Sequence, residues 1–201
     1  MDFRLIYRGK LPSASRSDSR VREKHAIRCE LHSQLKVLWR EHQALHTWET
    51  QPIAVDSEQT VFRTTADLRS NRYQRCNRRF LPLVDNAHGL ACSLDILFMR
   101  RDVAGSPIIK GGDIDNRLKV LLDALRVPED CSQIPSDWEP AADQDPLYCL
   151  MEDDSLITDI RVTTDRLLLP LEDDDNYKNV FLVIHAKTLI TDHERAYIEF
   201  I

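Results

Sequence analysis

Glycine and cysteine are both scarce in this sequence, and each scarcity excludes a class of protein. Five glycines among 201 residues exclude a collagen-like or glycine-rich low-complexity chain. The five cysteines are odd in number and widely spaced, without a C-x-x-C pair, so the sequence indicates neither a disulfide framework nor a zinc knuckle. They are Cys29, Cys76, Cys92, Cys131 and Cys149.

Long apolar runs are absent as well. No stretch approaches the roughly 18 consecutive apolar residues of a membrane-spanning helix, and residues 1–12 lack the apolar run of a signal peptide. We therefore expect no membrane contact and a cytoplasmic location. The hydrophobic share of 42% is too high for a disordered chain, so we expect a single domain over residues 1–201.

Charge is unevenly divided along the chain. Residues 1–112 hold 19 basic and 12 acidic residues, whereas residues 113–201 hold 8 and 21, so the two parts carry +7 and −13. The densest basic cluster surrounds Tyr73 and has Phe80 at its edge, a composition typical of phosphate contact with base stacking. We expect it to bind DNA, with a solvated helix face or loop as the alternative; its members are Arg69, Arg72, Arg75, Arg78 and Arg79.

The hydrophobic pattern predicts an α/β (α+β) fold in which a small mixed β-sheet packs against two helices. One is a long N-terminal helix over residues 23–47, and the other is a helix over residues 114–126. Residues 51–89 show no clear pattern beyond short strands near 60–64 and 80–84. The remaining predicted strands cover residues 3–7, 91–100, 157–163 and 180–187.

Residues 127–150 contain four prolines, many acidic side chains and no hydrophobic period. This composition predicts a long acidic loop inserted into the domain, where it could contact a protein partner or cover a neighbouring site.

Two further patterns have ordinary explanations that we prefer. His42 and His46 have the spacing of two zinc ligands on a helix, but no third ligand stands nearby, so we interpret them as partly exposed helix residues. Asp173, Asp174 and Asp175 are consecutive, whereas calcium loops space their ligands at alternate positions, so we interpret them as a solvated turn.

The most informative segment is Gly111–Leu125, with the sequence G-G-D-I-D-N-R-L-K-V-L-L-D-A-L. A helical period places Asp115, Lys119 and Asp123 on one face, opposite the leucines. Asp113 stands just before the helix, where it can cap the first N–H groups or join Asp115 in binding a divalent cation.

A second acidic cluster, Glu152, Asp153 and Asp154, precedes the predicted strand at 157–163. If the fold places the two clusters side by side, three or four carboxylates share one pocket. Mg²⁺ held by carboxylates activates water for phosphodiester hydrolysis, so the residues alone suggest a Mg²⁺-dependent nuclease.

Together, G-D-I-D-N-R-L-K-V-L-L-D-A-L and the downstream E-D-D-S-L-I-T-D-I-R-V resemble the RusA family of Holliday junction resolvases. The resemblance implies a RusA-like fold and a homodimer that uses Mg²⁺, with Mn²⁺ as a substitute, to nick branched DNA. It implies that Asp113, Asp115 and Asp154 bind the metal, with Asp153 beside them, and that Lys119 is needed for cleavage. Asn116 and Asp123 would support the site.

The loop at 127–150 departs from this family, whose members have only a few residues there. Two alternatives therefore stay open: a nuclease directed at phage or foreign DNA, and a non-catalytic DNA-binding or protein-interaction module with the same fold.

Overall fold

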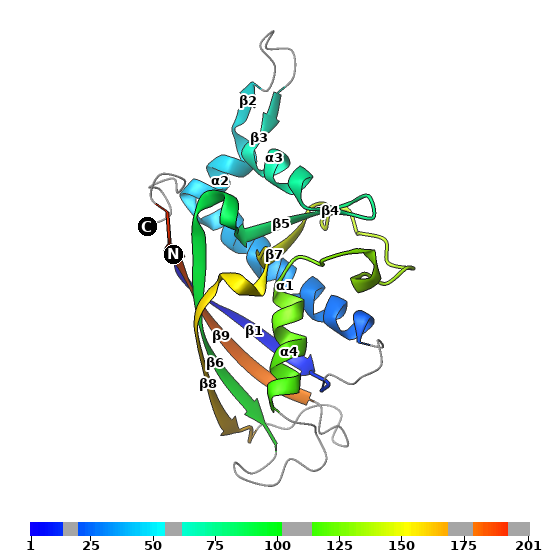
Figure 1. Ribbon diagram of the computed structural model, residues 1–201, viewed down its shortest axis with the longest axis vertical. Helices are drawn as coiled ribbons and strands as arrows, with labels where there is room; N and C mark the ends of the chain where they lie inside the picture. The colour runs from blue at the N-terminus through cyan, green and yellow to red at the C-terminus, as the bar shows by residue number, and fades with distance from the viewer. Residues whose placement is uncertain (14–19, 55–61, 102–113, 169–178, 193–201) are drawn as a thin grey trace.

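Four strands form the main sheet of an α+β fold (Figure 1). The computed structural model describes residues 1–13, 20–54, 62–101, 114–168 and 179–192. The strands are β1 (Asp2–Lys10), β9 (Asn179–Ile190), β6 (Leu90–Arg100) and β8 (Ile157–Arg166), in that spatial order. Both β1 and β6 run antiparallel to β9, whereas β8 runs parallel to β6, so the predicted mixed sheet is confirmed.

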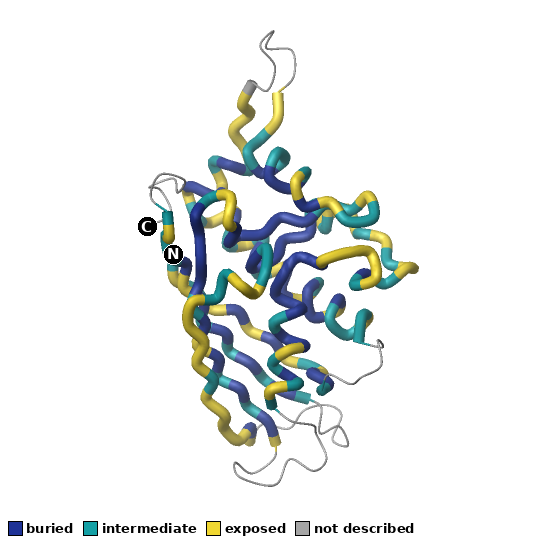
Figure 2. Tube along the Cα trace, in the orientation of Figure 1, coloured by how far each residue is buried: buried dark blue, intermediate teal, exposed yellow. Residues whose placement is uncertain are grey.

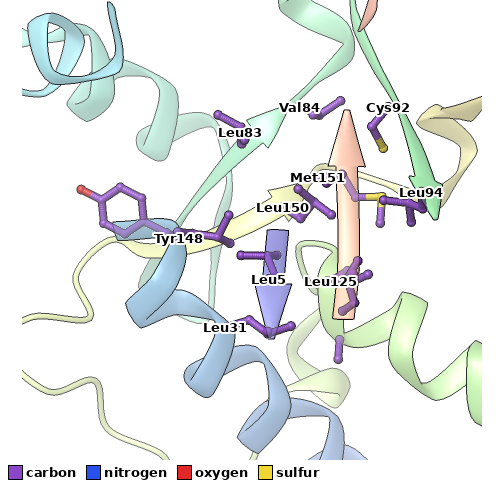
Figure 3. Close-up of a cluster of buried hydrophobic side chains, with 14 of the residues drawn as sticks. Leu5, Leu31, Leu83, Val84, Cys92, Leu94, Leu125, Tyr148, Leu150 and Met151 are labelled. Atoms are coloured by element: carbon purple, nitrogen blue, oxygen red, sulfur yellow. The ribbon is translucent and has the colours of Figure 1, made fainter. Parts of the chain in front are cut away.

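The main core lies between this sheet and two helices, α1 (Val21–Glu41) and α4 (Ile114–Leu125). Burial alternates along β9, and along β1 at Leu5 and Tyr7, because one face of each strand meets the helices. Figure 3 shows how Leu5 of β1, Leu31 of α1 and Leu125 of α4 meet within this core. Each of the three is at most 2% exposed.

A smaller sheet packs beside the main core, in the order β4 (Gln74–Arg75), β5 (Arg78–Val84) and β7 (Leu147–Met151). β5 and β7 run parallel and are buried over most of their length. Side chains from both strands join a second apolar cluster with residues of the 127–150 segment. That cluster comprises Tyr73, Phe80, Val127, Ile134, Leu147 and Cys149.

The remaining elements are short. A hairpin of β2 (Pro52–Ala54) and β3 (Phe62–Thr64) leads into α3 (Thr65–Arg72). Three single turns of 3₁₀ helix are η1 (Asn86–His88), η2 (Cys131–Gln133) and η3 (Asp154–Leu156). In the described part of the chain, every helix is too short or too polar to cross a membrane.

The single helix predicted over 23–47 is wrong in one respect, because the chain breaks at His42 and restarts as α2 (Gln43–Thr50). Trp39 and Trp48 are nine residues apart, so a continuous helix would point them in directions about 180° apart. The extended backbone of His42 (ψ 119°) lets both indoles enter the core, where they are 0% and 6% exposed.

The predicted loop at 127–150 is also partly wrong, since its last four residues belong to the buried strand β7. The other predicted helix and strands correspond to α4, β1, β3, β5, β6, β8 and β9, with changes at their ends. Asp113, with the glycines before it, and the acidic turn at 173–175 lie outside the described residues.

Candidate functional site

Asp115 and Lys119 occupy the exposed side of α4, one helical turn apart. The opposite side of the helix buries Val120, Leu121 and Leu125, which explains why these two charged side chains face solvent. Neither side chain forms an ion pair with another described residue. Their charged groups are therefore accessible to a cation, in the case of Asp115, and to a phosphate, in the case of Lys119.

Asp123, expected on the same face, is only 9% exposed and has a different role. Its carboxylate lies 2.7 Å from Lys24 Nζ and 3.2 Å from Arg126 Nη2. Its backbone carbonyl accepts a hydrogen bond of 2.8 Å from Arg28, which is itself 1% exposed. Asp123 thus joins α1 to the end of α4, and its oxygens are already occupied by cationic groups of the protein.

The second acidic cluster forms the turn that connects β7 to β8. Asp153 caps η3 by accepting a hydrogen bond of 3.0 Å from the backbone N–H of Ser155, and Arg126 Nη1 lies 3.7 Å from its carboxylate. The hydrogen bonds from Ser155, together with Arg126, hold the pKa of Asp153 below its usual value. Asp154 is exposed and forms no ion pair with the residues that the structure describes.

The start of α4 and the turn that connects β7 to β8 lie toward opposite ends of the helix (Figure 1). Asp115 is the second residue of the helix, whereas Arg126, which contacts Asp153, follows its last residue and bridges to Met151. Arg126 is eleven residues after Asp115 along the helix, a rise of about 16 Å. Asp115 therefore does not lie beside the second acidic cluster, contrary to the expectation from the sequence.

The residues present thus fit a bound cation only in part. Within the described ranges, no three His, Cys, Asp or Glu side chains are grouped so that they could hold a metal ion. At the start of α4, Asp115 offers a free carboxylate two positions after Asp113 in the sequence. Asp154 offers another, but at the far end of the helix, so of these two carboxylates only that of Asp115 lies at the start of α4.

Arg69, the first member of the basic cluster, is buried and cannot contact DNA in this structure. Its guanidinium lies 2.9 Å from the carboxylate of Asp85, and the two side chains are 2% and 1% exposed. It also lies over the indole ring of Trp48, 5.0 Å from the ring centre. Burial acts to raise the pKa of Asp85, but the hydrogen bond from His88 and the charge of Arg69 lower it below its usual value.

Three further members of the basic cluster bind the acidic segment at 127–150. Arg75 donates to the Glu129 carbonyl at 2.7 Å, and Arg79 lies 2.8 Å from Asp145. Arg78 donates to the Trp138 carbonyl, and its guanidinium lies over the Trp138 ring. Arg78 and Arg79 also form ion pairs with Glu139 and Asp145, so the acidic insertion balances part of the charge of the basic cluster.

Arg72 is the member of the cluster that remains exposed. It forms no ion pair with the part of the chain that the structure describes, so its guanidinium is accessible to a phosphate.

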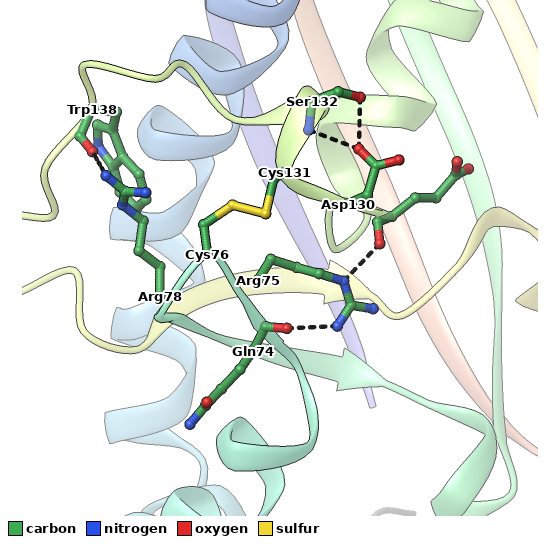
Figure 4. Close-up of a disulfide and its surroundings, with 9 residues drawn as sticks. Gln74, Arg75, Cys76, Arg78, Asp130, Cys131, Ser132 and Trp138 are labelled. Atoms are coloured by element: carbon green, nitrogen blue, oxygen red, sulfur yellow. Dashed lines mark hydrogen bonds between the residues drawn. A yellow bond between two sulfur atoms is a disulfide. The ribbon is translucent and has the colours of Figure 1, made fainter.

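A disulfide between Cys76 and Cys131 links the same two segments (Figure 4). The sequence indicated no disulfide, and the structure corrects this. The two cysteines are 55 residues apart, and sequence spacing alone does not show that the β4–β5 turn meets η2. Further contacts hold the segment against α1, including the ion pair of Arg22 with Asp137 at 3.0 Å.

The contacts of the basic residues Lys24, Arg28 and Arg126 with Asp123 were not predicted. Arg28 lies on the buried side of α1, one turn after Lys24, and donates at 3.1 Å to the carbonyl of Arg126. A basic residue within an apolar helical stripe is a signal of a buried partner, but the partner itself could not be identified before the fold was known.

No family model, curated protein or solved structure matches this chain. The resemblance to RusA resolvases therefore rests on the motif residues of α4 and of the turn after β7.

Proposed function

We propose that this protein is a Mg²⁺-dependent endodeoxyribonuclease that acts on branched DNA such as Holliday junctions, and that it works in the cytoplasm. The observation that carries the proposal is the exposed pair of Asp115 and Lys119, one turn apart at the start of α4 and just after Asp113. These residues also form the centre of the RusA-like motif.

Within the proposed site, Asp113 and Asp115 would hold the cation. Mg²⁺ bound there would supply a Lewis acid and an activated water, the chemistry that phosphodiester hydrolysis requires. Lys119 lies one turn further along the helix, where its ammonium group can balance charge on the phosphate. Asp123 and Asp153 fix the end of α4 and the turn after β7 through their ion pairs with Arg126.

The test is cleavage of a labelled four-way junction, a flap and a linear duplex, with Mg²⁺ and with EDTA. We expect Mg²⁺-dependent nicking of the junction by the wild type. Asp115→Asn and Lys119→Met should each lower the cleavage rate about 100-fold or more, since each removes a group that acts on the reacting phosphate. Asp95→Asn is the matched control, because Asp95 is exposed on β6 and lies outside the site.

Asp154→Asn tests whether Asp154 belongs to the metal site, as the RusA-like motif implies, or lies outside it, as in this structure. Because Asp154 lies at the other end of α4, we expect this variant to keep most of its activity. Loss of cleavage would show that Asp154 takes part in the reaction, as the RusA-like motif implies. Cleavage of all three substrates would keep the nuclease but would favour the alternative target of phage or foreign DNA.

The separation of the two acidic clusters favours a second candidate, a non-catalytic DNA-binding or protein-interaction module. Junction binding without cleavage, unchanged by Asp115→Asn, would support this candidate over the nuclease.

A further inference from the structure

The main sheet has one face that the core helices do not use. α1 and α4 both pack against the opposite face, where the main core lies (Figure 1). On the remaining face, which we call the outer face, Ile6 of β1 is 47% exposed. Every second residue of β9 from Phe181 to His185 is only half-buried there (Figure 2). The outer face is therefore accessible to a partner.

The outer face has two rings, each with an arginine beside it on the next strand. Arg8 of β1 lies directly opposite Phe181 of β9, and Arg4 lies directly opposite His185. Residues that are directly opposite on one face of a sheet have Cβ atoms about 5 Å apart, so each arginine flanks its ring. The two ring–arginine pairs are four residues apart along the strands, a distance of about 13 Å.

The groups in these two pairs suit contacts with a nucleic acid. Both arginines are exposed, and neither forms an ion pair within the described part of the chain. The His185 side chain is 31% exposed, and its Nε2 donates to the Asp2 carboxylate at 2.5 Å, which fixes the position of the ring. Guanidinium groups bind phosphates, and protein rings stack on bases. Each ring–arginine pair thus offers a base contact beside a phosphate contact.

The charge of the outer face differs between its two halves. The half formed by β1 and β9 is basic, with Arg4, Arg8, Lys10 and Lys187 against Asp2. The half formed by β6 and β8 is acidic, with Asp95, Asp159 and Asp165 against Arg161. A polyanion is therefore attracted to the β1–β9 half and repelled by the other.

We propose that the β1–β9 half of the outer face binds single-stranded DNA, with one base on each ring and one phosphate at each arginine. The strand must be unpaired, because bases within a duplex are stacked on each other and cannot stack on a protein ring. Ile6 and Val183 lie opposite each other between the two ring–arginine pairs. They offer an apolar surface to deoxyribose and no hydrogen-bonding partner to a 2′-hydroxyl group, which favours DNA over RNA.

This inference does not rest on the proposed nuclease activity, because α4 packs against the other face of the sheet. Its test measures binding in EDTA, where no Mg²⁺-dependent cleavage occurs. Asp115→Asn should bind single-stranded DNA as tightly as the wild type. A failure of the cleavage experiment and a failure of this inference are therefore distinguishable.

The test is the fluorescence anisotropy of a labelled oligothymidylate of about 12 nucleotides. Phe181→Leu should weaken binding about 10-fold, because it keeps an apolar side chain on β9 but removes the ring that stacks on a base. Phe181→Tyr keeps the ring and should bind like the wild type, which separates the loss of stacking from a general disturbance of the sheet.

A salt series tests the two arginines. Arg4→Gln and Arg8→Gln should each reduce the slope of log affinity against log salt by about 0.7, the value for one phosphate of a single strand. Arg161→Gln is the matched control and should leave the slope unchanged, because Arg161 lies on the same face but in the acidic half.

Four outcomes would overturn the proposal. They are a wild type that does not bind oligothymidylate, equal binding by Phe181→Leu and the wild type, an unchanged salt slope in both arginine variants, and tighter binding to an oligouridylate of the same length.

Discussion

Buried arginines in this molecule are structural, and Arg69 is the clearest case. A guanidinium that is 2% exposed needs partners inside the fold, and Asp85 and the carbonyl of Pro82 accept its hydrogen bonds. Removing one member of such a pair leaves the other charge buried without its counter-ion.

We therefore expect Arg69→Met to lower the free energy of unfolding by about 3 to 5 kcal/mol. Arg69→Met combined with Asp85→Asn should recover part of that loss, because the second change removes the uncompensated carboxylate. Urea denaturation followed by tryptophan fluorescence measures both. Arg72→Met in the same helix is the matched control, and we expect a change within about 0.5 kcal/mol because Arg72 is exposed.

His25 should make folding stability depend on pH. Burial, with the charges of Arg28 and Arg78, lowers the pKa of His25 to about 4. The unfolded chain binds this proton near pH 6.5, so it holds more protons than the folded protein between about pH 6.5 and 4. Above pH 6.5 His25 makes its full contribution to the free energy of unfolding. That contribution declines by up to about 3 kcal/mol as the pH falls through this window.

Unfolding free energies measured at several pH values between 7 and 4 should show this decline, and His25→Gln should make it shallower. The control is His46→Gln, which changes an exposed histidine. An unchanged pH slope in His25→Gln would contradict the assignment.

Among the elements, the acidic segment at 127–150 and the β4–β5 turn behave as one unit because the Cys76–Cys131 disulfide and the contacts of Arg75, Arg78 and Arg79 join them. Cross-linking residues 55 apart restricts the unfolded chain considerably. The segment is therefore held as part of the fold.

Cys76→Ser should lower the free energy of unfolding by about 2 to 4 kcal/mol. Cys131→Ser and the double variant should show the same loss, since any of the three removes the same bond. Reduction of the wild type should reproduce the effect, and it should add nothing in the variants. Non-reducing peptide mapping identifies the linked pair directly. Losses of stability that add up in the double variant would contradict the Cys76–Cys131 bond.

How far the sequence predicts an element depends on whether the signal is local. β1, β6, β9 and α4 were predicted because their periodicity is set by their own residues. α3 was missed although Thr64 and Asp67 form a capping box, because only Ala66 and Leu68 of its eight residues are apolar and they form no apolar stripe. β7 was missed because it is apolar on both faces and short, so neither helical nor strand periodicity shows.

In the candidate site, too, features set by local spacing were predicted and features set by long-range contacts were not. The exposure of Asp115 and Lys119 on one face of α4 follows from helical spacing and is confirmed. The position of Asp153 depends on where β7 ends relative to α4, a long-range relation that spacing along the chain does not contain. The DNA contacts expected of the basic cluster depend likewise on the acidic segment, whose contacts with Arg78 and Arg79 could not be inferred from composition.

For the molecule as a whole, the charge of −6 and the partly neutralised basic cluster predict weak binding to linear duplex DNA. We expect the slope of log affinity against log salt to correspond to fewer than about three phosphate contacts. Arg72→Ala should reduce that slope by about one contact. Fluorescence anisotropy over a salt series measures it, and a slope of about five or more contacts would show that the acidic segment releases the arginines on DNA.

The pairing of β1 with β9 has a consequence for synthesis on the ribosome. Asp2 pairs with Lys187, so the first strand cannot find its neighbour in the sheet until nearly all of the described chain has been made. α1 emerges much earlier, and its Gln34 binds the backbone of Ile6. Gln34 can therefore hold the nascent strand β1 against α1 while the rest of the protein is still being translated.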